Sequence, residues 1–132
     1  RNGVKHIVFY DDLLIADKKR LISLISNLRE KNILGKVSFS CAVRANLVNN
    51  EICHLLKELN VVDLGMGIES FSDKILRYYN KTGVTGEINQ RALDLLYNAG
   101  ITVNPSFIFA ATIETKEDML ITLSKIYINL IF

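Results

Sequence analysis

The chain has 132 residues, of which 49% are hydrophobic and 23% charged, and its formal net charge is +2. This size fits one ordinary domain, and the balance excludes a disordered chain and a strongly basic nucleic-acid-binding surface. Its apolar runs are too short to cross a membrane, and Asp11 and Asp12 interrupt the one that a signal peptide would need. We therefore expect residues 1–132 to form one soluble, cytoplasmic domain with no nucleic-acid or membrane partner.

Short apolar runs alternate with amphipathic segments along the chain. The apolar, β-branched runs predict strands, and segments with apolar residues at i, i+3, i+4 and i+7 predict helices. Strands are predicted over Val4–Tyr10, Lys36–Cys41, Val61–Gly67 and Ile101–Phe109. The first strand is followed by a helix capped by Asp17 and ended by Gly35, and the second by a helix capped by Asn49 or Asn50. Two helices follow the third strand, a short one opened by Ser70-x-x-Asp73 and ended at Tyr79 and one from Thr85 or Gly86 to Gly100, and a helix opened by Thr115-x-x-Asp118 follows the fourth. Both x-x spacings are those of a capping box.

Four strands separated by helices predict an α/β fold with a parallel sheet. The strands begin roughly 30 residues apart, the repeat of a (β/α)8 barrel of about 250 residues. A small doubly wound sheet fits the same spacing. The pattern leaves both architectures open, and in either one we expect strands that are apolar on both faces.

In both architectures ligands bind at the carboxyl ends of the strands. The residues at these predicted ends are polar: Asp11, Asp12, Cys41, Arg44, Glu69, Ser70, Thr112, Glu114 and Thr115. The carboxylates among them indicate recognition of an amine or of several hydroxyl groups. The alternative is that some of these side chains only cap the helices that follow.

Several short motifs, in a fixed order, resemble the radical S-adenosylmethionine (SAM) enzyme superfamily. They are Phe9-Tyr10-Asp11-Asp12-Leu13-Leu14, Cys41-Ala42-Val43-Arg44-Ala45-Asn46-Leu47-Val48, Gly65-Met66-Gly67-Ile68-Glu69-Ser70 with Asn80-Lys81 after it, Ala99-Gly100-Ile101, Phe107-Ile108-Phe109 and Ile113-Glu114-Thr115-Lys116-Glu117-Asp118. Order and spacing are similar to the Elp3/MiaB-type core, particularly to its cobalamin-dependent subgroup. The resemblance implies a partial TIM-type (β/α) barrel of about four parallel strands with helices on the outer face.

The resemblance also implies cofactors and site residues. The full-length enzyme would cleave SAM reductively at a 4Fe-4S cluster to start radical chemistry on an unidentified substrate, and cobalamin is a cofactor of the similar subgroup. Asp11 and Asp12 match the position that holds the methionyl amino group of SAM. Arg44 matches a position from which it could pair with the methionyl carboxylate of SAM. Glu69, assisted by Ser70, matches a position at the ribose or methionyl part. Adenine would pack against the strand that contains Asn104, Ser106 and Ile108, with Glu114 beside it.

The chain departs from the family pattern in two places. The cluster-binding CxxxCxxC motif is absent, and Cys41 and Cys53 are too far apart to replace it. A Gly-Pro-Gly-like turn is replaced by Ala110-Ala111-Thr112-Ile113. The first departure suggests a chain that starts at the second barrel strand and ends after the helix that follows the fifth. We expect such a fragment to bind no metal, to have no catalytic activity alone, and to self-associate through exposed strand edges or its last helix.

Two other classes of protein remain as alternatives. A phosphoacceptor receiver domain also ends a strand in paired aspartates, but it needs a further aspartate where this chain has Glu69, and a lysine at the end of a later strand. A non-catalytic α/β interaction module is the second alternative.

Overall fold

The computed structural model describes residues 3–11 and 14–131, with side chains up to residue 129. Its elements are β1 (His6–Val8), α1 (Lys18–Glu30), β2 (Ser38–Val43), a 3-10 turn (Ala45–Leu47), α2 (Asn50–Glu58), β3 (Val61–Glu69), α3 (Asp73–Tyr78), α4 (Gly86–Asn98), β4 (Thr102–Phe107) and α5 (Lys116–Ile131). All four predicted strands are present. The predicted edge strands extend too far, since regular pairing covers only three residues of β1 and six of β4.

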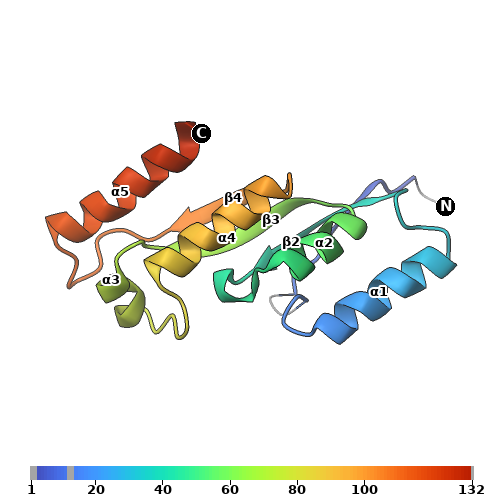
Figure 1. Ribbon diagram of the computed structural model, residues 1–132, viewed down its shortest axis with the longest axis horizontal. Coiled ribbons are helices and arrows are strands. Elements are labelled where there is room, and N and C mark those ends of the chain that lie inside the picture. The colour runs from blue at the N-terminus through green and yellow to red at the C-terminus, as the bar shows by residue number, and fades with distance from the viewer. Residues whose placement is uncertain (1–2, 12–13, 132) are drawn as a thin grey trace.

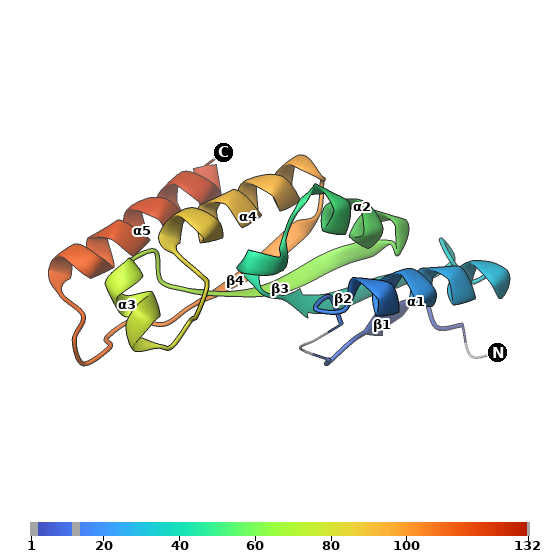
Figure 2. The ribbon, with the colours of Figure 1, turned by 60° about the horizontal axis from the view of Figure 1, so that its bottom comes forward.

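The four strands form one parallel sheet in the order β1-β2-β3-β4. Each strand therefore pairs with its neighbours in the sequence, and α1, α2, α4 and α5 lie on one face of the sheet (Figures 1 and 2). A doubly wound sheet reverses its strand order and carries helices on both faces. The sequential order is that of a (β/α) barrel, so the fold is a partial TIM-type barrel. The sequential strand order also excludes a receiver domain, which is a doubly wound fold.

The helix-facing side of the sheet is apolar. On β3, Leu64, Met66 and Ile68 alternate along this face and are at most 2% exposed. They pack in one core with Leu21 and Ile25 of α1, Leu56 of α2 and Leu96 of α4. Burial of each such side chain is worth about 1.5–3 kcal/mol, so this face holds the barrel layers together.

The opposite side, which we call the open face, is polar and small. It consists of the alternate residues His6, Val8, Ser38, Ser40, Ala42, Asp63, Gly65, Gly67, Thr102, Asn104 and Ser106, of which Val8 is the one branched apolar side chain. The His6 ring nitrogens hydrogen-bond to the Ser38 and Ser40 hydroxyls, and Asn104 donates to the Asp63 carboxylate. The prediction of strands that are apolar on both faces is therefore wrong. Barrel interiors are ordinarily filled by branched apolar side chains, of which these paired strand residues supply only Val8.

Three predicted helix starts are confirmed by side-chain caps. Asp17 accepts from the Lys19 and Arg20 amides, Asn49 from Ile52, and Thr85 from Ile88. Thr115 and Asp118 form the predicted capping box, in which each side chain accepts from the backbone amide of the other.

The prediction of a capping box that starts at Ser70 is wrong. Helix α3 begins two residues later, with Ser72 in the capping position. The Ser70 hydroxyl is instead 3.0 Å from the Thr122 hydroxyl and accepts from the Ser72 amide. A contact across 52 residues therefore prevails over the local pattern.

Candidate functional site

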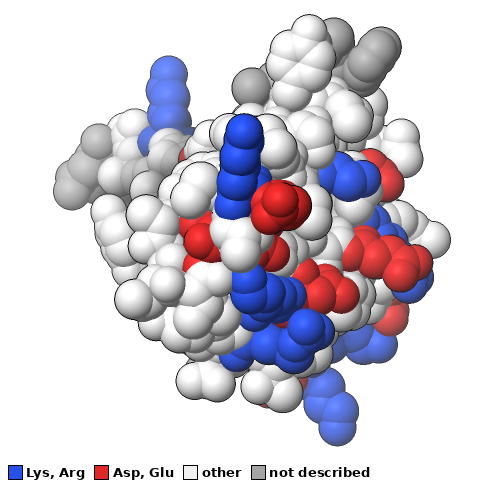
Figure 3. Space-filling model, turned by 90° about the vertical axis from the view of Figure 1, so that its left-hand side faces the viewer, with Lys and Arg blue, Asp and Glu red and all other residues white. Residues whose placement is uncertain are grey.

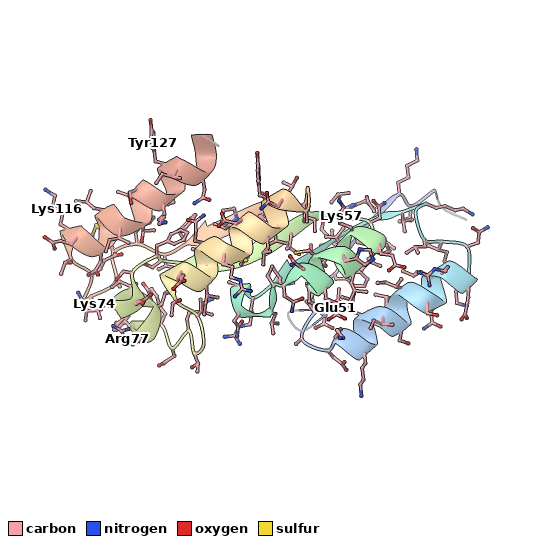
Figure 4. The ribbon with its side chains drawn as sticks, viewed as in Figure 1. Glu51, Lys57, Lys74, Arg77, Lys116 and Tyr127 are labelled. Atoms are coloured by element: carbon pink, nitrogen blue, oxygen red, sulfur yellow. The ribbon has the colours of Figure 1, made fainter. Side chains whose placement is uncertain are left out.

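The carboxyl ends of β3 and β4 and the segments that follow them form one end of the molecule. Figure 3 views this end and shows acidic and basic side chains interspersed across it. Lys74 and Arg77 of α3 lie here, as does Lys116 in the first turn of α5 (Figure 4). This is the end at which parallel α/β folds bind their ligands.

Glu69, the last residue of β3, has an unusual backbone. Its φ is +60°, in the left-handed region that residues other than glycine rarely adopt. The β3–β4 register shifts between Gly67 and Glu69, so the strand carries a bulge at this point. A strained residue at a bulge re-aims its side chain, and such strain concentrates at functional sites.

The Glu69 carboxylate forms an ion pair with Lys81, whose Nζ lies 2.9 Å from Oε1. The pair is sheltered, with 14% of the Glu69 and 24% of the Lys81 side chain exposed. Lys81 Nζ also lies 3.3 Å from the carbonyl oxygen of Gly67, to which it donates. An anion and a cation are thus held together at the end of β3.

Gly67 makes this arrangement possible. A Cβ built on Gly67 would lie 2.5 Å from Glu69 Oε1 and 3.1 Å from Lys81 Nζ. Any side chain here would displace the ion pair. Gly65, two residues earlier on the same face, has only the Cys41 carbonyl oxygen near its Cβ position, at an ordinary contact distance of 3.9 Å.

Sequence reasoning assigned no role to Lys81, although it noted Asn80-Lys81. The lysine lies twelve positions after Glu69 in the sequence, and the turn that follows α3 brings it back to β3. The signal that could have identified Lys81 was the Asn80-Lys81 motif, which is part of the resemblance but was given no role there.

The turn that joins β4 to α5 is closed by Glu114. Its Oε2 accepts from the Ala110 and Ala111 amides, while Oε1 is buried and has no hydrogen-bond partner among the described residues. Ala110 has a φ of +65°, at a turn where the related pattern has glycine. Glu114 and Glu69 also help to raise the pKa of Tyr79, after desolvation of its ring hydroxyl, which is the largest cause. Glu69 and the turn closed by Glu114 lie at the same end of two neighbouring strands, since the Ile108 amide donates to the Glu69 carbonyl.

Ser70 lies behind this region. It is fully buried, and its hydroxyl contacts Thr122 of α5, which also accepts from the Phe71 amide. Ser70 thus joins the end of β3 to α5, and its hydroxyl does not reach the open face.

The other predicted site residues are spread along the rim. Asp11 forms an ion pair with Arg20, at 2.6 Å. Asp12 lies outside the described residues. Arg44 is exposed and precedes the 3-10 turn after β2. On β4, Asn104 and Ser106 lie on the open face, and exposed Ile108 donates its amide to the Glu69 carbonyl. The structure thus brings Glu69, Ile108 and Glu114 to one end of two neighbouring strands.

The cysteines of this chain do not fit an iron–sulfur cluster. Cys41 and Cys53 are both free and buried. Burial, with a smaller contribution from the Asp63 charge, raises the pKa of Cys41 to about 11, and burial also raises that of Cys53. Cluster ligands are thiolates, which both sites disfavour. No group of three or more His, Cys, Asp or Glu side chains in the described residues could hold a metal ion.

The strand order and the helices on one face define a barrel-type α/β protein. The family model of the radical SAM superfamily matches residues 1–126, and the chain belongs to that superfamily. No helix in the described part of the chain is long and apolar enough to cross a membrane.

Two curated relatives are similar in sequence. An uncharacterized methyltransferase of Pyrococcus horikoshii is 29% identical over 117 residues, which are 89% of this chain and 25% of the relative. A putative methylthiotransferase of Methanocaldococcus jannaschii is 34% identical over 107 residues, 80% of this chain and 23% of the relative. The chain thus spans about a quarter of the length of these relatives.

Solved structures confirm the fold. The cobalamin-dependent SAM radical enzyme OxsB, with aqua-cobalamin and SAM bound, has a TM-score of 0.82 at 24% identity, over 93% of this chain and 19% of that one. The radical SAM methyltransferase TsrM of Kitasatospora setae, with cobalamin and a [4Fe-4S] cluster bound, has the same TM-score at 16% identity, over 96% of this chain and 26% of that one.

Proposed function

We propose that the end of the sheet formed by β3 and β4 binds SAM, in a radical SAM enzyme of which this chain is a part. The observation that carries this proposal is the sheltered Glu69–Lys81 pair at the end of β3. SAM has an ammonium group and two ribose hydroxyls that a carboxylate can bind, and a carboxylate that a lysine can bind. An adjacent anion and cation suit such a ligand.

Each residue has a part in this proposal. Glu69 accepts from the ribose hydroxyls or the methionyl ammonium, and Lys81 donates to the methionyl carboxylate. Ile108 and Phe109, whose side chains are 43% and 40% exposed, supply an apolar surface for adenine. Glu114 holds the turn that presents them, through its bonds to the Ala110 and Ala111 amides. Asp11, Asp12, Arg44, Asn104 and Ser106 remain further candidates for contacts with SAM.

The whole enzyme is proposed to cleave SAM reductively at a 4Fe-4S cluster and to transfer a methyl or methylthio group. The sequence relatives support this reaction class, since both are named for such transfers. Cobalamin is a candidate further cofactor, because both similar solved enzymes contain it. The cysteines of this chain do not hold the cluster. The residues of this chain are therefore proposed to bind and orient SAM and to exclude water from it.

The test is titration of the chain with SAM, followed in ¹H–¹⁵N NMR spectra. Without a cluster iron to anchor the methionyl group, we expect a dissociation constant no tighter than about 1 mM, a binding free energy near −4 kcal/mol. The amides of Gly67, Glu69, Lys81 and Ile108 should shift in a saturable way.

A matched pair of variants locates the site. Glu69→Gln should weaken binding by at least about tenfold, since a charge-assisted bond is worth about 1.5–3 kcal/mol. Glu51→Gln, on α2 and distant from the site (Figure 4), should leave binding unchanged. Shifts that persist in Glu69→Gln, or that occur only elsewhere in the chain, would reject the site.

A further inference from the structure

The backbone around Glu69 forms a tight three-residue turn. The Ser70 amide donates to the Ile68 carbonyl oxygen, two residues back, at 2.7 Å, and the φ of Glu69 between them is +60°. This combination is the rare and strained form of the γ-turn. Strained backbone persists only where the surrounding structure holds it. The contacts that hold this turn therefore also hold the residue whose carboxylate pairs with Lys81.

Asn89 of α4 supplies such contacts. Its Nδ2 donates to the Ile68 carbonyl oxygen at 3.1 Å and to the Ser70 carbonyl oxygen at 3.0 Å. Both partners are acceptors, so the nitrogen end of the Asn89 amide faces them. The carbonyl oxygen of Glu69 accepts instead from the Ile108 amide. One amide group thus bridges the two peptide carbonyls on either side of Glu69.

The other end of the Asn89 amide is unsatisfied. Asn89 is fully buried, and its Oδ1 is buried without a hydrogen-bond partner among the described residues. A buried acceptor that lacks a partner destabilises a fold, and an apolar side chain of similar volume would avoid this cost. Packing therefore does not account for an asparagine at this position. Its two donors, both of which are used on the turn, do account for it.

Gly86 brings Asn89 within reach of the turn. A Cβ on Gly86 would overlap the carbonyl oxygen of Phe71, so the first turn of α4 packs directly on the backbone that follows Glu69. The Gly86 amide also donates to the Asp73 carboxylate at 2.8 Å. Residues three apart share a helix face, which places Asn89 on the same side of α4 as Gly86.

We propose that Asn89 is a positioning residue of the SAM site, which holds the turn that aims the Glu69 carboxylate at Lys81. This role rests on the proposed function, because Glu69 and Lys81 are the proposed contacts of SAM. Asn89 is fully buried and acts through Glu69. Without its two hydrogen bonds, Glu69 would relax toward an ordinary negative φ, and its carboxylate would leave Lys81.

The test compares Asn89→Leu with Asn98→Leu. Leucine is similar in volume to asparagine but donates to neither carbonyl, and Asn98 is an exposed asparagine at the end of the same helix. The signature of the turn is the NOE between the amide and α protons of Glu69, which lie closest when φ is positive. A role in stability alone would lower the unfolding midpoint but leave this NOE and the SAM affinity of the folded chain unchanged.

We expect two changes in folded Asn89→Leu. The Glu69 NOE should fall to the level of Val62, an extended residue of the same strand. The dissociation constant for SAM should rise at least about fivefold, because the binding-competent conformer becomes a minor one. Asn98→Leu should change neither quantity. The proposal requires both changes, so a variant that shows only one of them, or neither, would overturn it.

If Asn89→Leu does not fold, the parent chain provides a second measurement. A ligand that needs the turn also stabilises it, by the reciprocity of linked equilibria. At ten times its dissociation constant, SAM should slow solvent exchange of the Asn89 side-chain amide by at least about fivefold. It should slow exchange of the Leu56 backbone amide, in the core of α2, by less. Equal slowing of both groups, or none at Asn89, would reject the positioning role.

The two proposals fail in different ways. SAM binding that folded Asn89→Leu retains at full strength rejects the positioning role alone. A parent chain that binds no SAM rejects the proposed function and, with it, the role of Asn89 in that site.

Discussion

The Asp118 carboxylate, in the first turn of α5, lies 2.6 Å from the hydroxyl of Ser72, the residue that precedes α3. The same carboxylate accepts from Lys74 Nζ at 2.7 Å and from the amide and hydroxyl of Thr115. Asp118 is 6% exposed. A single side chain therefore joins the segment that directly follows Glu69 to the start of α5, which directly follows the turn that contains Glu114.

We predict that Asp118→Asn destabilises the chain more than Asp94→Asn does. Asparagine cannot accept four hydrogen bonds or compensate Lys74, so the buried Ser72 hydroxyl and the first turn of α5 lose part of their hydrogen bonding. Asp94 is exposed and bonds only to Gln90 among the described residues, so its replacement is the control. Urea unfolding of the three proteins gives the comparison, and equal midpoints for the two variants would contradict the prediction.

The same network predicts the dependence of stability on pH. The hydrogen bonds from Lys74 and then Ser72 hold the pKa of Asp118 well below its usual range. A carboxyl group whose folded pKa is depressed stabilises the fold above its unfolded pKa of about 3.9, and this stabilisation is lost as the pH falls below that value. Unfolding midpoints measured from neutral pH to below pH 4 should fall less steeply in Asp118→Asn than in the parent chain.

Two glycines of β3 should respond differently to alanine. Gly67→Ala forces the Glu69 carboxylate away from Lys81, but these are the ends of flexible side chains, so stability should change by no more than about 1 kcal/mol. SAM binding should weaken markedly, because the ion pair is displaced. Gly65→Ala meets no close atom and should preserve the pair and the binding. The same NMR titration measures both, and equal effects of the two variants would be inconsistent with the role of Gly67.

Ala110→Gly should stabilise the chain by about 0.5 kcal/mol. An L-residue in the left-handed region costs about 1–2 kcal/mol, and the flexibility of glycine in the unfolded chain offsets part of the gain. Ala99→Gly, at the right-handed end of α4, is the control and should destabilise by about 0.5–1 kcal/mol. Thermal or urea unfolding measures both. Destabilisation by both substitutions would indicate that the strain at Ala110 is negligible.

Local patterns predicted the elements, because caps and periodicity act over a few residues. Asp17, Asn49 and Thr85 bond to amides two or three residues ahead, which the sequence displays directly. The Ser70 cap was predicted wrongly, because the competing partner of its hydroxyl is Thr122, on another helix. Lys81 was missed for the same reason. Its partner Glu69 is near only after α3 folds back.

The choice between a barrel and a doubly wound sheet also depended on long-range information. Both architectures have the same strand spacing, and only the pairing order β1-β2-β3-β4 separates them. The polar open face could have been found from the alternation of Asp63, Gly65, Gly67 and Glu69 with Leu64, Met66 and Ile68. Expecting a parallel strand to be apolar on both faces obscured that alternation.

The chain alone should not assemble a 4Fe-4S cluster. Cys41 and Cys53 are buried, and their raised pKa values keep them as thiols at neutral pH. After anaerobic reconstitution, iron and sulfide should stay at the level of a Cys41→Ala, Cys53→Ala double variant. Stoichiometric iron and sulfide that the double variant loses would contradict this prediction.

The last prediction is that the chain self-associates. β1 and β4 are the edge strands of the described sheet, and at the β1 edge Ile7 and Val8 are 38% and 47% exposed. On α5, Leu120 and Tyr127 are 53% and 68% exposed, while the side chains of residues 130–132 lie outside the described part. Unprotected strand edges and apolar helix faces both favour pairing between copies.

Light scattering at tens of micromolar should therefore report a dimer or a larger species. Val8→Lys should lower the association if the edge of β1 mediates it, and Tyr127→Lys if α5 does. Ile22→Lys is the control, since Ile22 is an exposed apolar residue that belongs neither to β1 nor to α5, and it should have no effect. A strictly monomeric parent chain would contradict the prediction. Equal loss of association in all three variants would show that hydrophobicity in general, and neither surface in particular, is responsible.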